Sequence, residues 1–297
     1  MEIVVDSENN KRIDAYLSSK LEYSRSKIEK MLEDGLILID GKKIKRSYVP
    51  KAGDIIAVTE PEVKQMNVEA ENIPLDIVYE DEDVIIVNKG NGMVVHPAVG
   101  NNNGTLVNAL LFHSKNLSNV NGEFRPGIVH RIDAYTTGLL MIAKNDKAHE
   151  ELAKELSISK TKRKYIALVW GVINEDTATI DAPIGRDSTD RKKMAITSNG
   201  KDAITHLKVL ERYKNATLVE LTLETGRTHQ IRVHMNYIGH PVVNDPVYGR
   251  RKIIDNTGQC LHAKTIGFTH PRTHKYMEFT SELPECFINI LNKFKEE

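Results

Sequence analysis

Short runs of β-branched and other apolar residues recur between residues 75 and 224, and they limit the possible folds most strongly. They are LDIVYE (75–80), DVIIVNK (83–89), MVVHP (93–97), GLLMIAK (138–144), KYIALVWG (164–171) and ATLVELTLE (216–224). Such runs, bounded by polar residues and glycines, are typical of β-strands. Helical periodicity is found near residues 105–114, 146–158 and 229–238. Because strands follow one another without strict alternation with helices, we expect an α+β domain with a mixed, largely antiparallel sheet.

The segment before these runs, residues 10–60, predicts a separate small α/β module of two amphipathic helices and a hairpin. Apolar residues recur every four positions in the first helix: Ile13, Leu17 and Leu21. Ser24 is a candidate N-cap of the second helix, and Gly35 would end it. A strand, an Asp-Gly turn at residues 40–41 and a basic second arm follow, as in a β-hairpin.

The predicted module leaves seven basic side chains free to form one basic face: Arg25, Lys27, Lys30, Lys42, Lys43, Lys45 and Arg46. Charge alone does not separate a nucleic-acid-binding face from a solvated surface. After the module, EPEVKQMNVEAENIP (60–74) is polar and without periodicity, which is typical of a linker. We therefore expect a module at residues 1–60, a linker at 61–73 and a second domain at 74–297.

Composition narrows the class of protein. In 297 residues, 40% are hydrophobic and 28% charged, as in ordinary globular proteins. No stretch approaches the ~20 apolar residues of a membrane span, and the N-terminal residues do not resemble a signal peptide, so we expect a cytoplasmic protein without membrane association. Basic and acidic residues number 41 each, so overall charge does not favour coating nucleic acid. The two cysteines, Cys260 and Cys286, form no metal-binding pair.

A dense polar constellation, RPGIVHRIDAYTTGLLMIAK, spans residues 125–144. Arg131 and Asp133 lie between apolar runs, at the mouth of a core, where a charged group must be paired or used. The alternative is that Arg131 and Asp133 only stabilise a turn and have no role in function. A kinase catalytic loop is excluded, because the Asp-Phe-Gly segment and the glycine-rich loop are missing.

A second constellation spans residues 223–249 and packs Arg227, His229, Gln230, Arg232 and His234 into eight positions. The spacing of its histidines does not suit a metal on one helix face, and no nearby Cys or Glu completes a ligand set, so we expect no metal. The guanidinium groups suit phosphates and carboxylates. A third piece, KTKRKYIALVWG (160–171), is a basic stretch that enters a strand at Tyr165.

Together, these pieces resemble the RluA/RluD family of RNA pseudouridine synthases. HRIDAYTTGLL is similar to the family's catalytic-aspartate motif, KRKYIALVWG to its Lys-x-Tyr motif and TGRTHQIRVHM to its arginine motif. GMVVHPAVGNNNGTLVNALL, GHPVVNDPVYG and LHAKTIGFTHP match in order. Residues 12–56 resemble the RNA-binding module named after ribosomal protein S4. The usual HRLDxxTSG has Ile132 and Thr137 here, and NKGNG stands where NKPAG is common, changes that remove no functional group.

The resemblance implies the pseudouridine synthase fold and the isomerisation of uridine to pseudouridine in large-subunit (23S) ribosomal RNA or its precursor particle. It implies Asp133 as the catalytic carboxylate, Arg232 as its partner in preference to Arg227, and Tyr165 as the base. The reaction is redox-neutral, so no cofactor and no metal are expected. RNA contacts are expected from the basic face and from four residues near the site: Arg131, Lys164, Arg227 and His229. The target nucleotide should be flipped out of its stem or hairpin.

Several alternatives stay open at this point. The sequence does not decide whether Asp133 attacks the sugar or forms a glycal, which uridines react, or what the oligomeric state is, although we expect a monomer. A non-catalytic RNA-binding or ribosome-assembly protein on this fold could lose Asp133 or Tyr165, and both are present. A glycosidase would need a second acid beside Asp133, and neither motif supplies one.

Overall fold

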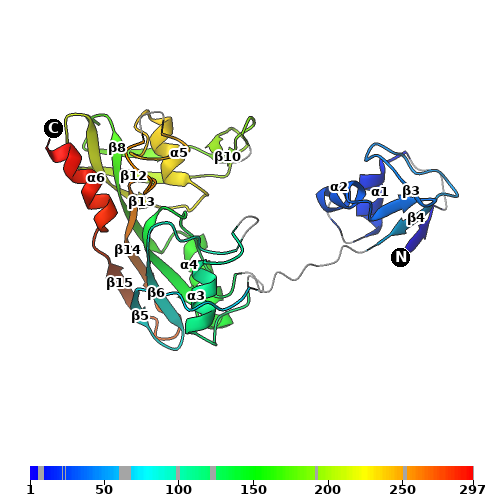
Figure 1. The fold of residues 1–297 in the computed structure, drawn as a ribbon, viewed down its shortest axis with the longest axis horizontal. Helices are drawn as coiled ribbons and strands as arrows, with labels where there is room; N and C mark the ends of the chain where they lie inside the picture. Colours follow the sequence, from blue (N-terminus) through cyan, green and yellow to red (C-terminus); the bar gives the residue numbers. More distant parts are fainter. Residues whose placement is uncertain are drawn as a thin grey trace. The chain divides into compact units, whose positions relative to one another are not determined.

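Two compact units, Met1–Gln65 and Met66–Glu297, make up the protein in a computed structural model (Figure 1). The structure describes residues 1–5, 10–21, 23, 25–59, 68–97, 101–120, 125–190, 193–249 and 253–296, without the side chains of residues 26 and 27. Among these residues, no helix is both long enough and apolar enough to cross a membrane.

The first unit packs two helices on a small antiparallel sheet. Its elements are β1 (Glu2–Val4), α1 (Ile13–Lys20), α2 (Arg25–Glu33), β2 (Ile37–Ile39), β3 (Lys42–Lys43) and β4 (Ile55–Val58), with the strand order β1-β4-β2-β3. Ile13 and Leu17 of α1 are fully buried with Ile28 of α2 and Ile56 of β4. The expected helices and hairpin are therefore present, and they share one apolar core.

Two turns of the first unit depend on backbone conformations with positive φ. Gly35 ends α2 with a φ of 75°. In the hairpin between β2 and β3, Asp40 has a φ of 47° and Gly41 a φ of 72°, the combination that an Asp-Gly two-residue turn favours. The sequence signals for these turns are thus confirmed. Ser24, the candidate N-cap, lies outside the described residues.

In its described residues, the second unit contains a nine-stranded sheet, a two-stranded sheet and four helices. The large sheet consists of β5 (Ile77–Glu80), β6 (Val84–Lys89), β7 (Thr137–Ala143), β8 (Lys162–Trp170), β9 (Thr177–Asp181), β12 (Ile204–Arg212), β13 (Ala216–Leu223), β14 (Leu261–Thr269) and β15 (Tyr276–Thr280). The small sheet consists of β10 (Ile184–Arg186) and β11 (Met194–Ile196). The helices are α3 (Leu106–His113), α4 (Asp146–Ser157), α5 (Gln230–Tyr237) and α6 (Glu285–Lys295).

The large sheet is mixed and largely antiparallel, as the sequence predicts. Its strands run in the order β5-β6-β7-β14-β8-β13-β12-β9, and β15 pairs with β14 outside that path. Of the pairings in this sheet, only that between β7 and β14 is parallel. This topology brings the end of the chain back between β7 and β8, so that segments far apart in sequence share the centre of the sheet.

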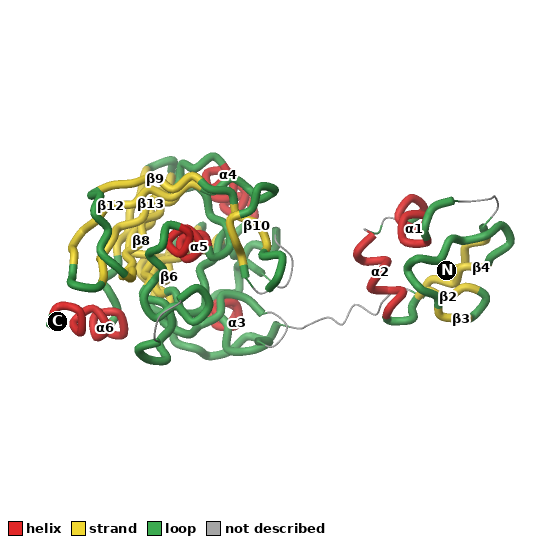
Figure 2. Tube along the Cα trace, turned by 90° about the horizontal axis from the view of Figure 1, so that it is seen from above, coloured by secondary structure: helices red, strands yellow, loops and turns green. Residues whose placement is uncertain are grey.

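Apolar side chains on both faces of the large sheet pack against helices, and Figure 2 shows the traces of α3 and α4 well apart from each other. Ile85 of β6 packs in one core with Leu110 of α3, whereas the adjacent Ile86 packs in another with Leu152 of α4. Side chains that alternate along a strand point to opposite faces, so β6 lies between two apolar layers. Trp170 of β8 meets Phe294 of α6 edge to face, with ring centroids 5.4 Å apart.

The structure differs from the sequence-based expectations at residues 93–97, and it contains elements that were not expected, among them β9, β12, β15 and α6. The three helices expected in this unit are present, but residues 93–97 are not a strand. The carbonyl groups of Val94 and Val95 instead accept hydrogen bonds from Leu106 and Val107, the first residues of α3. These carbonyls satisfy helix N–H groups that lack an intrahelical partner. Strand β14, by contrast, was not among the expected strands.

The segment expected to be a linker falls partly within the second unit. Residues 60–67 lie outside the described residues. Residues 68–73, which were also expected in the linker, bind α3: Glu71 N–H donates to the Asn108 carbonyl, and the Asn108 side chain donates to the Glu69 carbonyl. Val68 packs against the core of the second unit.

Candidate active site

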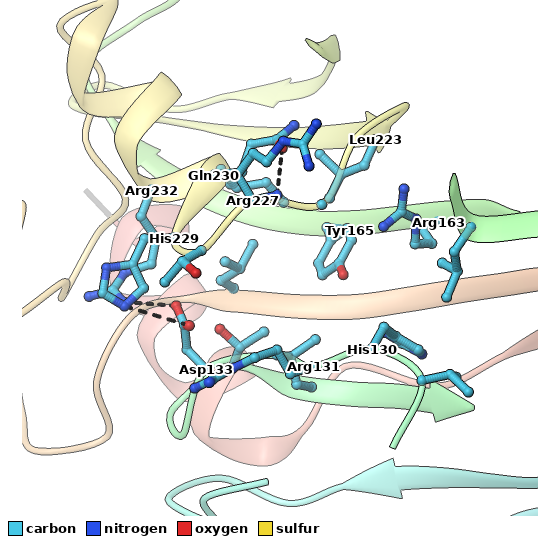
Figure 3. A pocket seen from close by; sticks show the side chains of 18 of the residues that line it. His130, Arg131, Asp133, Arg163, Tyr165, Leu223, Arg227, His229, Gln230 and Arg232 are labelled. Carbon is cyan, nitrogen blue, oxygen red and sulfur yellow. Dashed lines mark hydrogen bonds and ion pairs between the residues drawn. The ribbon is translucent and has the colours of Figure 1, made fainter. Parts of the chain in front are cut away.

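A pocket of about 380 Å³ in the second unit contains the three residues expected to carry the chemistry. Asp133 comes from the loop before β7, Tyr165 from β8 and Arg232 from the first turn of α5 (Figure 3). Asp133 and Arg232 are 99 positions apart in sequence. The order of strands in the large sheet therefore creates this site, because β7 and β8 both pair with β14.

Asp133 accepts a hydrogen bond from Arg232, with 2.8 Å between Oδ2 and Nη1. The Arg232 side chain is 4% exposed, and the Asp133 side chain, at 18%, is the more open to the pocket. The guanidinium thus supplies both a hydrogen bond and an opposite charge to this carboxylate. Arg227, the other candidate, donates its Nε–H to the Asp202 carbonyl, so the structure pairs Asp133 with Arg232.

A second carboxylate, Asp245, holds Arg232 from the other side. Both its oxygens bind the guanidinium, at 2.7 Å from Nε and 2.9 Å from Nη2, and its side chain is fully buried. Backbone N–H groups of Val247 and Tyr248 donate to the same carboxylate. Burial opposes the charge of Arg232, but the attraction of Asp245 and Asp133 outweighs it and raises the pKa of Arg232.

His229 forms the wall beside Asp133. It precedes α5 with a φ of 57°, which few residues other than glycine adopt, and its Nε2 lies 3.7 Å from Asp133 Oδ1. Its Nδ1 is 2.8 Å from the hydroxyl of Tyr248, which also accepts a hydrogen bond from the Met194 N–H. With the hydroxyl proton directed at Nδ1, the remaining imidazole proton points from Nε2 toward Asp133. Burial lowers the pKa of His229, which favours this neutral ring.

Tyr165 stands in the middle of the pocket (Figure 3). Its side chain is mostly buried, and none of the described residues hydrogen-bonds its hydroxyl. Burial raises the pKa of the hydroxyl, the nearby Arg163 lowers it, and Asp133 raises it. The hydroxyl is therefore available to a bound nucleotide.

Alternation along β8 decides which basic residues reach the pocket. Arg163 and Tyr165 both line it, as residues two positions apart on one strand should. Lys162 and Lys164 point to the other face, where they pair with Glu278 and Glu220. Lys164, expected to contact RNA near the site, is thus not part of the pocket, and Arg163, which was not singled out, is.

Arg131 lies at the exposed rim of the pocket and His96 orients it. Nη1 of Arg131 is 3.2 Å from Nε2 of His96, a buried side chain. Burial and the charge of Arg131 lower the pKa of His96 to about 4, so the ring is neutral and accepts this hydrogen bond. His96 therefore fixes the orientation of the Arg131 guanidinium, and the side that faces away from His96 remains available for binding.

A buried lysine supports the loop that carries Asp133. Lys89, at the end of β6, is 1% exposed and donates to the carbonyls of Gly90 and Ala134, at 2.8 and 2.7 Å. Burial lowers its pKa to about 7, and the charge of Asp133 opposes that shift. Because Ala134 directly follows Asp133, this ammonium fixes the position of the loop that carries Asp133.

Sequence reasoning missed several residues that build the site: Lys89, His130, Arg163, Asp245 and Tyr248. The last two lie in GHPVVNDPVYG, which resembled the family as a motif although no role was assigned to its residues. The other singled-out residues of the α5 segment are structural. The amide oxygen and the amide nitrogen of Gln230 are both hydrogen-bonded within the fold, and buried His234 bonds Thr205 and the Ala182 carbonyl.

The described residues contain one group with metal-ligand geometry, Asp81, Asp83 and His270, away from the pocket. Asp83 binds Arg272 through both oxygens, and Asp81 accepts hydrogen bonds from Tyr79 and two backbone N–H groups. These protein partners account for the carboxylates as an ion-pair network. No observation links this group to the reaction.

The described side chains of the predicted basic face are exposed, but one of them, Arg25, has a partner within the fold. Arg25 binds the fully buried Asp14, with 2.6 Å between Nη2 and Oδ2, so its charge stabilises the fold of this unit. Lys30, Lys42, Lys43, Lys45 and Arg46 are exposed on α2, β3 and the following turn. The side chain of Lys27 lies outside the described ones. RNA binding by this face stays a prediction.

Comparison with known proteins identifies relatives of both units. Residues 83–237 match the family model for RNA pseudouridylate synthase, and residues 11–56 match that of the S4 domain. An uncharacterized RNA pseudouridine synthase, YlyB of Bacillus subtilis, is 51% identical over 98% of this chain and 96% of its own length. Ribosomal large subunit pseudouridine synthase D of Pseudomonas aeruginosa is 42% identical over 93% of this chain and 89% of its own. The solved structure of human RNA pseudouridylate synthase domain containing 1 is 26% identical, with a TM-score of 0.58 over 77% of this chain and 97% of that one.

Proposed function

The chain belongs to the RNA pseudouridylate synthase family, and we propose that it isomerises specific uridines of large-subunit (23S) ribosomal RNA through the Asp133 carboxylate. The Asp133 carboxylate, held by Arg232 in the same pocket as Tyr165, is the observation that supports this mechanism. The ribosomal target is supported by relatives named ribosomal large subunit pseudouridine synthase D and by the S4 domain. Such a substrate would place the enzyme in the cytoplasm, where we expect a monomer.

The reaction breaks the bond between uracil N1 and C1′ of ribose, turns the base and joins C5 to C1′. A carboxylate beside an anomeric carbon can attack it or stabilise its positive charge, as in glycosidases. Asp133 can add to C1′, or it can remove the C2′ proton to form a glycal and later return that proton. In both routes the electrons of the broken bond leave with the uracil. Both require the ionised carboxylate that Arg232 stabilises, and neither consumes a cofactor.

His229 and Tyr248 would keep Asp133 in a reactive orientation. The neutral ring directs Nε2–H toward the oxygen that Arg232 does not bind, so each oxygen of Asp133 faces an N–H group. Because Tyr248 fixes the ring from behind, the geometry does not depend on bound RNA.

The last step removes the C5 proton from the rejoined base, and we assign it to Tyr165 as the base. Its hydroxyl has no partner among the described residues and faces the same cavity as Asp133. Burial raises the pKa of Tyr165, so its phenolate is a stronger base but a smaller fraction of the hydroxyl is deprotonated. The neighbouring Arg163 lowers this pKa and favours the phenolate.

The target uridine must leave its helix to reach a carboxylate within this pocket, so the enzyme flips the base. Arg131 at the rim and Arg227, which also lines the pocket, would bind flanking phosphates, and the basic face of the S4 unit would dock the surrounding RNA. A glycosidase reading is disfavoured, because Asp133 is the only carboxylate among the described residues that line the pocket.

Mapping of pseudouridine in ribosomal RNA, by carbodiimide modification and reverse transcription, tests the proposal. RNA from cells that lack the protein should lose modified positions, and purified protein should restore them in a transcript. Asp133→Asn should restore none while still binding the transcript, because the amide keeps the shape and loses the charge. A tenth of wild-type turnover in Asp133→Asn would exclude this carboxylate as the catalytic group.

A further inference from the structure

Arg163 is a buried arginine without a counter-ion. The residue is 6% exposed, and its one hydrogen bond goes from Nη2 to the Glu224 carbonyl. Its Nε has no partner, and no carboxylate of the described chain forms an ion pair with it. The other buried cations described above are paired differently. Arg232 binds two carboxylates, and Lys89 donates hydrogen bonds to two carbonyl groups.

An unpaired buried cation is costly for a folded protein. Burial and the charge of Arg227 lower the pKa of Arg163, and the shift stops short of neutralising a guanidinium. A methionine would fill the same space without this cost. A residue that disfavours folding and lines the reaction pocket is typical of a functional site.

The surroundings of Arg163 are arranged for an anion. Gly226 makes room for it, since a Cβ at that position would come within 2.5 Å of Nη1. His130 lies on the facing wall, at the end of the pocket away from Asp133 (Figure 3). Its Nε2 accepts the Met141 N–H, and burial lowers its pKa to about 3, so the neutral ring keeps its proton on Nδ1 as a donor. Exposed Ser157 lines the pocket too, so the pocket reaches the surface at the end of α4.

We propose that Arg163 and the Nδ1–H of His130 form an anion subsite for one phosphate of the RNA backbone next to the flipped uridine. The inference rests on the proposed function, since it assumes that RNA enters this pocket. A phosphate supplies the negative charge that Arg163 lacks and accepts several hydrogen bonds at once. A uracil carbonyl would leave the cation uncompensated.

A binding cycle with chemically altered RNA tests the subsite. The probe is a hairpin selected by its binding to the intact protein, in which each phosphate around the target uridine is replaced in turn by a neutral methylphosphonate. A 2′-O-methyl nucleotide precedes each altered linkage, and the same nucleotide with a normal phosphate is the reference. Wild type is compared with Arg163→Gln, Arg163→Lys and Lys162→Gln, the last of which loses a cation from the opposite face of the same strand.

At one linkage, the methylphosphonate should weaken wild-type binding about tenfold or more and leave Arg163→Gln unaffected. Arg163→Gln should also lower the slope of log affinity against log salt by about 0.7 to 0.9, whereas Lys162→Gln should match wild type. Arg163→Lys should keep the charge-dependent slope. The melting temperature of Arg163→Gln should not fall, because a buried charge has been removed.

Equal sensitivity of wild type and Arg163→Gln at every linkage would overturn the proposal, even if the variant binds weakly. So would a large fall in melting temperature together with weakened binding at all linkages, because Arg163 would then be structural. The cycle measures binding and needs no turnover. A failure of the ribosomal RNA assignment would appear in the mapping experiment and would leave this test intact.

Discussion

Arg232 binds two carboxylates, Asp245 and Asp133, which we expect to have different roles. Replacing each carboxylate by asparagine should distinguish the two roles. Asp245→Asn removes the charge that holds Arg232 in the fold, and Asp133→Asn removes the charge that faces the pocket. Asp245 is fully buried and binds Nε and Nη2, whereas Asp133 binds Nη1 and is partly open to the pocket. We therefore expect Asp245→Asn to lose stability and activity together and Asp133→Asn to lose activity alone.

The magnitude follows from the burial of the pair. Removing one partner of a buried ion pair costs about 3 to 5 kcal/mol, because the other charge stays in the interior uncompensated. The asparagine amide would also direct N–H donors at the Nε–H of Arg232, which donates to Asp245 at 2.7 Å. For a domain of this size, each kcal/mol lowers the melting temperature by about 2 to 4 °C, so the expected fall is about 6 to 20 °C.

Urea unfolding followed by fluorescence measures this directly, because Trp170 is the only tryptophan and packs in the core with Phe294. Glu278→Gln is the matched control: it removes an exposed carboxylate paired with Lys162 and should cost less than about 1 kcal/mol. Equal unfolding midpoints for wild type and Asp245→Asn would refute the anchoring role. Equal losses for the two asparagine variants would refute the division of duties.

Three further predictions concern turnover, pH and RNA affinity. Tyr165→Phe should lose turnover, measured on a short transcript, and keep its melting temperature, since only the hydroxyl is removed; retained turnover would exclude Tyr165 as the base. The pKa of His130 falls from 6.5 to about 3 on folding, so below about pH 6.5 the unfolded chain binds a proton that the folded one does not. Unfolding should therefore need less urea as the pH decreases from 7 to 5, with a shallower decrease in His130→Gln; equal decreases would contradict this. Deletion of residues 1–60 should leave the second unit folded but weaken binding to long ribosomal RNA, and a truncated protein with unchanged affinity and salt dependence would make the basic face a solvated surface.

Strand and helix signals were reliable where local pattern decides the structure. Apolar runs at β6, β7 and β8 became strands, and Asp40 and Gly41 formed the turn their residue types favour. The run at residues 93–97 failed, because β-branched residues also suit an extended segment whose carbonyls cap a helix. Strand β14 was not expected, since Lys264 and Gly267 interrupt its apolar pattern, although it occupies the centre of the sheet.

For the site, the motifs identified Asp133, Tyr165 and Arg232, which the structure brings into one pocket, but they did not identify the residues that support them. The sequence left open whether Arg227 or Arg232 pairs with Asp133, and only the fold settles that choice. Asp245 could not be assigned, because nothing local shows which arginine a buried aspartate faces. Lys89 could not either, since lysines are almost never fully buried. Arg163 was within reach: once Tyr165 is placed in the pocket, strand alternation puts the residue two positions earlier on the same face.

The charges of the pocket explain how a protein of zero net charge can hold RNA strongly at one place. Arg232 is matched by Asp133 and Asp245, so the reacting end carries its own counter-charges. Arg163 and Arg131 line the same pocket without a carboxylate partner among the described residues, which leaves the rest of the pocket positive. A bound RNA strand would supply the missing negative charge there, while Arg232 stays paired with Asp133 and Asp245. Phosphate binding and catalysis can therefore use adjacent parts of one pocket without competing for the same cation.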